Sequence, residues 1–362
     1  MTSLRIASLA FVLCLIALAS LQAQTITTLH SFNGMDGALP IGSLVEDSGA
    51  TLYGTTSEGG SNGPFGPGTV FKITPDDIVI TLHNFNGDDG DQPSVTLVLA
   101  TDGNLYGTTW QGGSNNYGTI FKVTTAGGFT VLHSFTGGTD GQYPGPLIQA
   151  SDGNFYGTAW GGADNNCGAD GGCGVIFRIT AQGDFTKIYQ FQGSSNDGYG
   201  PQGIIEGSDG NFYGTALSFS RVLCNSECGS VFKVTPNGSL TQLHVFNGTD
   251  GNIPLGQLLL ATDGNFYGTT EEGGAYAGGT VFKMTPSGAL TSLYSFCSDP
   301  QDNCPDGDGP ASGVMQASDG TLYGTTVGTI FTITPSGSLT TFYRFTGGGP
   351  GGRLFQASNG NF

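Results

Sequence analysis

A four-residue phrase that recurs six times most constrains how this chain of 362 residues can fold. It reads Tyr-Gly-Thr-Thr, with Ala in place of the last Thr in two copies. Its tyrosines are Tyr53, Tyr106, Tyr156, Tyr213, Tyr267 and Tyr323, spaced 50 to 57 residues apart. A second phrase, typically Gly-Thr-Val/Ile-Phe-Lys, follows each copy and places Phe71, Phe121, Phe177, Phe232, Phe282 and Phe331 in register. A period near 50 built from short β-type segments is typical of a β-propeller or another repeat array.

The second repeat shows four strand candidates, here called A, B, C and D. Strand A covers Ser94 to Ala100, and an Asp-Gly-Asn turn then leads into strand B, Leu105 to Trp110. After a polar loop come strand C, Gly118 to Val123, and strand D, Phe129 to Phe135. Gly tolerates positive φ and Asp can bond its own backbone, so the A–B turn predicts a hairpin. Four short antiparallel strands per repeat make up a propeller blade.

The number of strands predicts an all-β propeller with six complete four-stranded antiparallel blades and a partial seventh. A and D phrases occur seven times each, whereas B and C phrases occur six times. A lone D phrase, Leu29 to Phe32, opens the array, and an A phrase, Arg353 to Ala357, comes near its end. We therefore expect the two to share a blade, and the domain, residues 24–362, to be truncated at its C-terminus. More than seven blades, or six blades with loose ends, are the alternatives.

Residues 1–23 have the features of a secretory signal peptide. Arg5 gives a positive start, Ile6 to Leu18 is apolar, and Ala23 ends a plausible cleavage site. An uncleaved anchor is the alternative. No other segment is long and apolar enough to span a bilayer. We expect a secreted or cell-surface protein with no transmembrane segment after signal removal.

The formal net charge of -18 limits the partners of this chain. A phosphate backbone would be repelled, so nucleic acid is not expected as a partner. Cations, or neutral polar ligands such as glycans, are electrostatically easier. An extracellular glycan or a cell-surface protein is the expected partner.

Six cysteines remain after signal removal, and they form three close pairs in polar segments. The pairs are Cys167/Cys173, Cys224/Cys228 and Cys297/Cys304. In an exported protein such pairs indicate local loop disulfides. Zinc is the alternative, but it needs four ligands and these pairs belong to three repeats with no His nearby in sequence.

These phrases resemble the GloVer-type tandem repeat, a predicted β-propeller repeat of secreted bacterial proteins. The fifth repeat carries the resemblance in Asp263 to Thr270, Asp-Gly-Asn-Phe-Tyr-Gly-Thr-Thr, and Gly279 to Lys283, Gly-Thr-Val-Phe-Lys. The match covers roughly residues 25 to 362. Arg178 and Thr332 replace the Lys in two copies, so that residue is not essential. The resemblance implies export, and it brings no established catalytic residues.

Two groups of residues could bind metal. The histidines share one D-strand slot with tyrosines, which favours a half-buried structural ring over a metal ligand or a catalytic base; they are His30, His83, His133 and His244, beside Tyr189, Tyr294 and Tyr343. The acidic D-to-A links read as repeated Asx turns or, alternatively, as Ca²⁺ sites, because hard cations prefer carboxylates. Asp88, Asp89 and Asp91, and Asp302, Asp306 and Asp308, are the candidate calcium ligands.

The only two tryptophans suggest a ligand-binding surface. Trp110 and Trp160 follow the repeated phrase directly, at equivalent positions of adjacent blades. With four antiparallel strands per blade, the B–C loops and D–A links emerge on one face, called here the loop face. Flat aromatics beside carboxylates and amides suit glycan binding, and packing at a strand end is the alternative.

The sequence therefore predicts a non-catalytic extracellular binding or surface module, with a glycan as the ligand class. A secreted carbohydrate-active hydrolase or lyase is the first alternative. Glycoside hydrolysis needs two carboxyl groups at a defined separation, and the sequence alone does not place such a pair. A purely structural surface repeat protein is the second.

Overall fold

The computed structural model describes residues 26–93, 96–163, 167, 172–194, 196–217, 228–299, 304–310, 312–346, 349 and 352–362. Every regular element in these residues is a β-strand. Within the same ranges, no helix is long and apolar enough to cross a membrane.

Twenty-four strands form six antiparallel sheets of four, each following the order of the chain. Blade one holds β1 (Val45–Glu46), β2 (Leu52–Thr56), β3 (Thr69–Ile73) and β4 (Val79–Asn84). Blade two holds β5 (Val98–Leu99), β6 (Leu105–Thr109), β7 (Thr119–Val123) and β8 (Phe129–Ser134). Blade three holds β9 (Gln142–Gln149), β10 (Phe155–Gly161), β11 (Val175–Ile179) and β12 (Phe185–Gln190).

The remaining strands repeat this plan. Blade four holds β13 (Tyr199–Glu206), β14 (Phe212–Leu217), β15 (Ser230–Val234) and β16 (Leu240–Val245). Blade five holds β17 (Leu259–Leu260), β18 (Phe266–Thr270), β19 (Thr280–Met284) and β20 (Leu290–Ser295). Blade six holds β21 (Val314–Gln316), β22 (Leu322–Thr325), β23 (Thr329–Ile333) and β24 (Leu339–Arg344).

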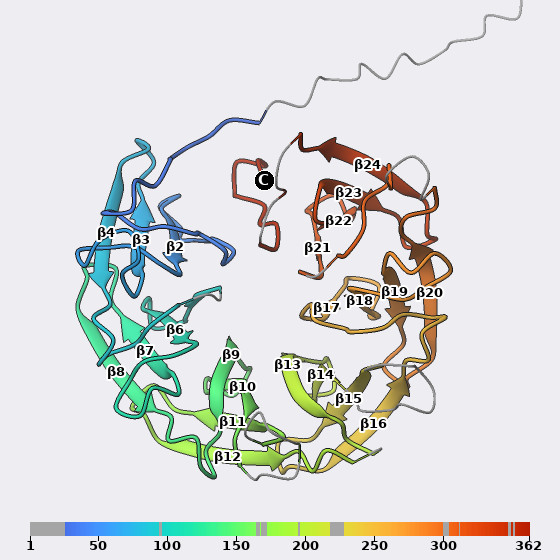
Figure 1. The fold of residues 1–362 in the computed structure, drawn as a ribbon, viewed down its shortest axis with the longest axis horizontal. Coiled ribbons are helices and arrows are strands. Elements are labelled where there is room, and N and C mark those ends of the chain that lie inside the picture. Colours follow the sequence, from blue (N-terminus) through green and yellow to red (C-terminus); the bar gives the residue numbers. More distant parts are fainter. Residues whose placement is uncertain are drawn as a thin grey trace, which may run out of the picture.

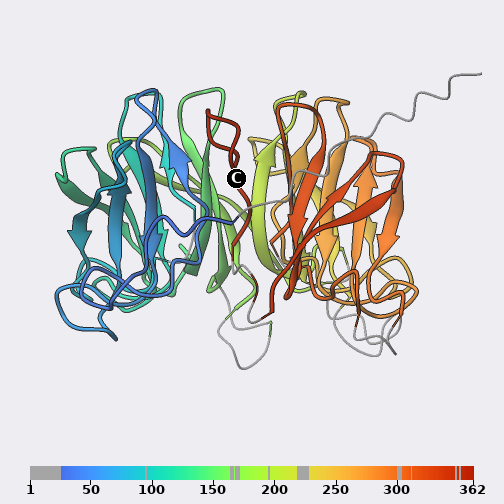
Figure 2. The ribbon, with the colours of Figure 1, turned by 90° about the horizontal axis from the view of Figure 1, so that it is seen from above.

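The sheets stand around a common axis as the blades of a propeller (Figure 1). The first strand of each blade faces the axis, and the fourth forms the outer wall (Figures 1 and 2). The predicted all-β fold of six four-stranded blades is therefore confirmed. The predicted partial seventh blade is not shown as a sheet, because residues 352–362 pair with no strand in the described chain.

The Gly of the repeated Tyr-Gly-Thr phrase is required because the ring of the C-strand Phe packs directly against its Cα. A Cβ on Gly54 would lie 2.7 Å from the ring of Phe71, and one on Gly268 would lie 2.4 Å from that of Phe282. Only Gly therefore lets the C-strand Phe lie flat against the B-strand backbone.

The Tyr and the first Thr of the phrase each make a hydrogen bond through their side-chain hydroxyl group. The Tyr106 hydroxyl donates to Asp102 of the A–B turn at 2.8 Å, and Tyr213 bonds Asp209 in the same way at 3.0 Å. The first Thr reaches the next blade, since the Thr108 hydroxyl donates to the Gly145 carbonyl at 2.9 Å. One phrase thus ties the B strand to its own turn and to the neighbouring blade.

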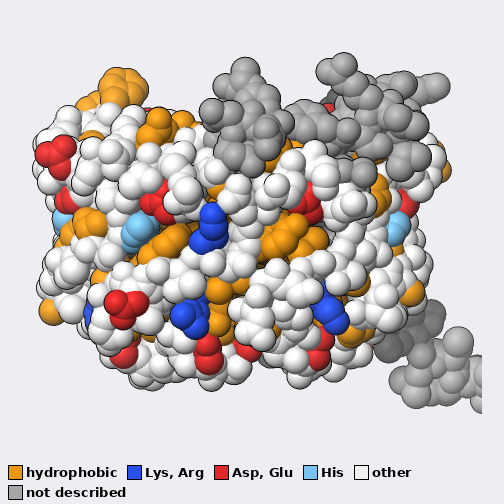
Figure 3. Space-filling view, turned by 90° about the horizontal axis from the view of Figure 1, so that it is seen from below, with side chains coloured by type: hydrophobic (Ala, Val, Ile, Leu, Met, Phe, Trp, Pro, Cys, Tyr) orange, Lys and Arg blue, Asp and Glu red, His pale blue; other side chains and the backbone are white. Residues whose placement is uncertain are grey.

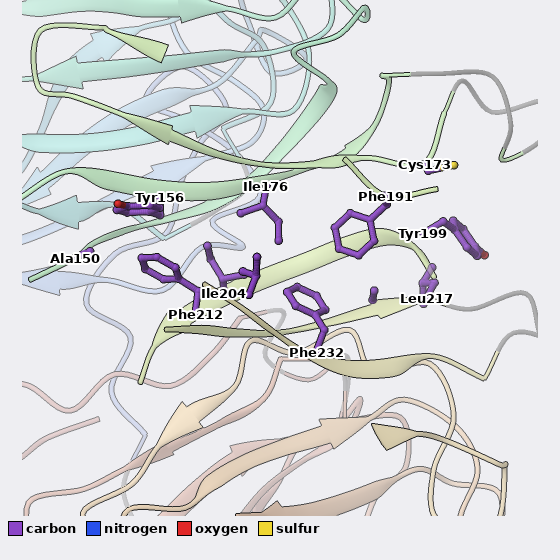
Figure 4. Close-up of a cluster of buried hydrophobic side chains, with 12 residues drawn as sticks. Ala150, Tyr156, Cys173, Ile176, Phe191, Tyr199, Ile204, Phe212, Leu217 and Phe232 are labelled. Carbon is purple, nitrogen blue, oxygen red and sulfur yellow. The ribbon is translucent and has the colours of Figure 1, made fainter. Parts of the chain in front are cut away.

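The core lies between neighbouring blades. Between blades three and four, Tyr156, Ile176 and Phe191 pack against Phe212 and Phe232 (Figure 4). The rings of Phe191 and Phe232 meet edge-on, with centroids 5.4 Å apart. Each blade therefore buries one face against the next blade, as expected for a repeat that cannot bury its apolar surface alone.

Candidate functional site

A cavity of about 360 Å³ lies where the inner segments of several blades meet residues 353–356. Its lining residues are Ser43, Leu44, Val45, Thr96, Leu97, Pro146, Leu147, Gln257, Met315, Gln316, Arg353, Leu354, Phe355 and Gln356. This set of lining residues contains no Asp, Glu, His or Cys. The axial cavity therefore combines an apolar wall with amide, hydroxyl and guanidinium groups, and offers no acid–base pair.

Arg353 is the one charged side chain in this lining. Its Nη2 donates to the Val314 carbonyl at 2.6 Å, and Nη1 lies 3.5 Å from Oε1 of Gln257. Its buried Nε has no hydrogen-bond partner in the described chain. Burial lowers the pKa of the guanidinium to about 10 because desolvation disfavours the charged form. Arg353 therefore stays positively charged at neutral pH.

The three glutamines of the cavity differ in what their amides do. Gln316 accepts from the Thr262 backbone N–H at 2.9 Å, and Gln356 accepts from that of Ser318 at 2.8 Å. Both amides thus hold the A–B turn of the preceding blade. Gln257 donates to the Ile204 carbonyl at 2.8 Å and turns its oxygen toward Arg353. Gln257 and Arg353 are therefore the polar pair of the axial cavity.

A second recurring arrangement joins six of the seven D-strand rings to an aspartate of the link that follows. The pairs are His30–Asp36 at 2.8 Å, His83–Asp89 at 3.0 Å, His133–Asp140 at 3.1 Å, Tyr189–Asp197 at 3.1 Å, His244–Asp250 at 2.9 Å and Tyr294–Asp306 at 2.7 Å. Histidine and acidic side chains lie side by side along the outer wall (Figure 3). Sequence reasoning treated the rings and the acidic links separately, although a spacing of six residues from His to Asp recurs in three repeats.

The environment of one pair shows its structural character. The His83 ring stacks on Phe129, with centroids 3.6 Å apart. The other oxygen of Asp89 accepts from the Asn86 backbone N–H at 3.0 Å, which closes the turn. Burial lowers the pKa of His83, and the charge of Asp89 opposes that shift. The ring and the carboxylate therefore fasten strand to link, in agreement with the structural interpretation of the histidine slot.

The predicted calcium ligands that the structure describes lie in different surroundings. Asp89 and Asp306 bond D-strand rings, and burial raises the pKa of Asp91. Asp88 and Asp308 are exposed, and Asp302 lies outside the described residues. Across the described ranges, no group of three or more His, Cys, Asp or Glu could hold a metal ion. Calcium binding stays a prediction.

The two tryptophans occupy equivalent sites at the ends of their B strands. Trp110 is half-buried, and its ring stacks on Tyr143 of blade three with centroids 5.1 Å apart. Trp160 is half-buried against blade four, where a Cβ on Gly200 would lie 2.8 Å from its Nε1. Each indole therefore packs on the next blade. A role in ligand binding stays a prediction.

Two of the three predicted disulfides are confirmed. Cys167 bonds Cys173, and Cys297 bonds Cys304. Both bonds are local, since the bonded cysteines are six and seven residues apart in sequence.

The third predicted disulfide, between Cys224 and Cys228, stays a prediction as a pairing. Cys228 is disulfide-bonded, but its predicted partner, Cys224, lies outside the described residues. Cys228 lies between strands β14 and β15, as the predicted loop position requires. Its side chain is 0% exposed and belongs to an apolar cluster with Val231 and Phe246, because the chain enters the core between blades four and five as strand β15 begins at Ser230.

Six four-stranded antiparallel blades around an axial cavity define a β-propeller protein. The profile of the Gloeobacter/Verrucomicrobia repeat matches residues 16–170 and 168–362. The chain therefore belongs to the Gloeobacter/Verrucomicrobia repeat family, and the predicted resemblance is confirmed.

Solved structures share the fold at low identity. A structure of streptogramin B lyase is similar with a TM-score of 0.61 and 15% identity, covering 90% of this chain and 89% of the other. The extracellular domain of a hybrid two-component system from B. thetaiotaomicron has a TM-score of 0.59 and 14% identity. That match covers 89% of this chain but only 37% of the larger protein. No curated protein matches this chain in sequence.

Proposed function

We propose that this chain is an exported, non-catalytic binding module that holds a glycan in its axial cavity. The observation that carries the proposal is the Arg353–Gln257 pair, set in an apolar wall with Phe355. Ligand sites combine an apolar lining with a few placed polar groups, and the volume of about 360 Å³ lies within their usual range. A sugar offers both the hydroxyl oxygens and the apolar ring face that such a lining can bind.

Arg353 favours ligands that carry oxygen acceptors. A guanidinium can donate to hydroxyl oxygens and, more strongly, to a carboxylate. The lining residues hold no carboxylate that would compete for it. Because the lining also holds no acid–base pair, it supports binding rather than glycoside hydrolysis, which needs two carboxyl groups.

Export is part of the proposal. We assign residues 1–23 to a signal peptide and residues 24–362 to the propeller domain. Two disulfides support an oxidising compartment, where such bonds persist. The ligand would then be an extracellular glycan or a glycan on a cell surface.

We also assign residues 29–32 and 352–362 to a partial seventh blade. The Ser358 backbone N–H donates to Glu46 of blade one at 2.6 Å, just as that of Ser151 donates to Glu206 at 2.7 Å between blades three and four. On the outer wall, Phe32 meets Phe71 with centroids 5.0 Å apart, repeating the contact between D- and C-strand Phe residues of adjacent blades. Residues 353–356 thereby take an inner position and line the axial cavity.

A glycan array probed with the whole chain, followed by calorimetry on any hit, tests the proposal. We expect Gln257→Leu to weaken binding by ten-fold or more, because it removes the amide beside Arg353. Gln182→Leu, in an exposed turn, is the matched control and should bind normally. Thermal unfolding of each variant separates a lost ligand contact from a lost fold.

The alternatives give different results. Binding that is lost in Trp110→Ala with Trp160→Ala, but kept in Gln257→Leu, would move the site to the loop face. A blank array would contradict glycan binding and favour the purely structural alternative. Release of reducing ends from polysaccharides would favour the hydrolase or lyase alternative.

A further inference from the structure

The inner strands supply a ring of equivalent positions around the propeller axis. The position lies two residues before the partner of the repeated Tyr; in blade one, Val45 pairs with Tyr53, and Ser43 holds the position. Arg353 holds it in the last inner segment, because the Gln-Ala-Ser that begins three residues later repeats that of blade six. We call these residues the axial ring: Ser43, Thr96, Pro146, Gly203, Gln257, Gly313 and Arg353.

The axial ring is built from inner segments only. Five of its seven members line the axial cavity, and the other two are glycines, which bring no side chain. A Cβ on Gly203 would lie 3.3 Å from Cγ of Pro146 and 3.5 Å from Cγ of Gln257, so the members of the ring converge. In the complete blades, the second, third and fourth strands stand farther from the axis (Figure 1). The chemistry of the ring is therefore set by the inner segments alone.

Arg353 is the one charged member of the axial ring and of the cavity lining. Its Nη2 bonds the Val314 carbonyl, and its Nη1 lies 3.5 Å from Oε1 of Gln257. Its Nε has no acceptor in the described chain, although a guanidinium can donate from every nitrogen. Burial lowers the pKa of Arg353, and no neighbouring carboxylate offsets that effect. Arg353 is therefore a cation without a carboxylate among the residues that surround it.

The cavity differs in charge from the chain as a whole. A charge that is taken out of water without a counterion is costly, and an anionic group that enters the cavity offsets this cost. A carboxylate suits the guanidinium, because two parallel N–H···O bonds can join them. The formal charge of -18 opposes this little, because the lining holds no Asp or Glu, and salt largely screens exposed charges beyond about 8 Å. The cavity is therefore locally positive.

The rest of the lining suits a sugar better than a simple organic acid. Leu97, Leu147 and Phe355 bring apolar surface, and Ser43 and Thr96 bring hydroxyl groups. The Thr96 oxygen accepts from the Ser43 backbone N–H at 3.2 Å, so its hydroxyl hydrogen can donate to a ligand. The volume of about 360 Å³ is near the lower end of the usual range of ligand sites, ~300–1,000 Å³. The cavity therefore matches a short saccharide.

We infer that the axial cavity binds an acidic saccharide, with the carboxylate of a hexuronic acid residue paired to Arg353. This inference rests on the proposed glycan-binding function and narrows its ligand class. The guanidinium donates to the ligand carboxylate. Ser43 and Thr96 bond the sugar hydroxyl groups, and the apolar side chains contact the C–H face of the sugar ring.

Calorimetry on the whole chain tests the inference with saccharides that differ only at the carboxyl group. Trigalacturonate and cellotriouronate are titrated beside their carboxyl-reduced forms, and any acidic hit from the glycan array is treated in the same way. We expect an acidic form to bind about ten-fold or more tightly than its reduced form, because only the acidic form pairs with Arg353. Acetate controls for a carboxylate without a sugar and should not compete at the same concentration.

Variants in the axial ring isolate the charge of Arg353. Arg353→Gln should lose the preference for the acidic form, whereas Arg353→Lys, which keeps the charge but not the planar fork, should retain part of it. Gln257→Glu places a carboxylate beside Nη1 and should weaken binding of the acidic form far more than that of the reduced form. If Arg353→Gln fails to fold in thermal unfolding, Gln257→Glu decides.

Gln149→Glu is the matched control for an added carboxylate. Gln149 lies outside the cavity lining and accepts from the Thr101 backbone N–H, a contact that Glu206 makes to Ser151 in the next blade. The variant should therefore fold and should bind the acidic form as the wild type does.

The outcomes separate this inference from the proposed function. Equal binding of acidic and reduced forms, or tighter binding of the reduced form, overturns the inference and leaves glycan binding in place. A preference that survives Arg353→Gln also overturns it, because another group would then recognise the carboxylate. Competition by acetate equal to that of the saccharide does the same. If neither form of any saccharide binds, the proposed function fails and the inference fails with it.

Discussion

His83 Nε2 lies 3.0 Å from Asp89 Oδ2, and this contact joins the outermost strand of blade one to the link that enters blade two. The same carboxylate closes the turn by accepting the Asn86 N–H. Equivalent pairs recur around the ring, with Tyr in place of His in blades three and five. The pairs therefore act as repeated fasteners between the outer wall and the next inner strand.

The first prediction concerns which member of the pair matters. We expect Asp89→Ala to lower the free energy of unfolding by about 1–3 kcal/mol, because it leaves the His83 ring and the Asn86 N–H without their acceptor. His83→Tyr should have a much smaller effect, since Tyr189 makes the same contact with its own aspartate at 3.1 Å. Urea denaturation measures both. Asp88→Ala, one residue away and exposed, is the control, and equal losses for Asp88→Ala and Asp89→Ala would contradict the fastener role.

The second prediction concerns acid. Burial lowers the pKa of His83 and His133 below the ordinary value of 6.5, despite the opposing effect of their aspartates. The unfolded chain then binds more protons than the folded chain in the range below about pH 6.5, so stability falls as the pH drops through that range. Replacing both histidines by Tyr should flatten the dependence of Tm on pH between about pH 5 and 7. An unchanged slope would show that other groups set the acid response.

Much of the fold was predictable because the repeat places every element in phase. The phrase around Tyr106 locates strand B, its turn and strand C, so the count of complete blades needed only the sequence. The contact between His83 and Asp89 was missed because each residue recurs in its own phrase, and only the folded D–A link brings them together. The axial cavity was also missed, since Arg353 and Gln257 lie 96 residues apart and meet only across the ring.

The third prediction concerns the Gly of the repeated phrase. A Cβ on Gly268 would lie 2.4 Å from the Phe282 ring and 2.9 Å from Leu258. We expect Gly268→Ala to destabilise the protein by about 1–3 kcal/mol, the usual cost of overpacking. Gly328→Ala is a matched control, because no atom lies within 4 Å of its added Cβ and its φ is not positive. Differential scanning calorimetry would compare them, and equal Tm values would contradict the packing argument.

The last prediction concerns alkaline pH and the tyrosines that bond the A–B turns. Burial and the adjacent carboxylates raise the pKa of Tyr53, Tyr156 and Tyr213 to about 12. Above about pH 10 the unfolded chain loses phenolic protons that the folded chain keeps, so stability falls as the pH rises from about 10 to 12. Absorbance of tyrosinate should therefore show a group of tyrosines that titrates together with unfolding.

Tyr213→Phe tests the origin of this alkaline sensitivity. The variant lacks the hydroxyl that donates to Asp209 at 3.0 Å, so it should lose about 1 kcal/mol at neutral pH. Because it also lacks one ionisable phenol, its stability should fall less steeply between about pH 10 and 12 than that of the wild type. Tyr276→Phe, at an exposed loop position, is the control. If both variants follow the wild-type pH profile, the Tyr–Asp contacts do not cause the alkaline loss of stability.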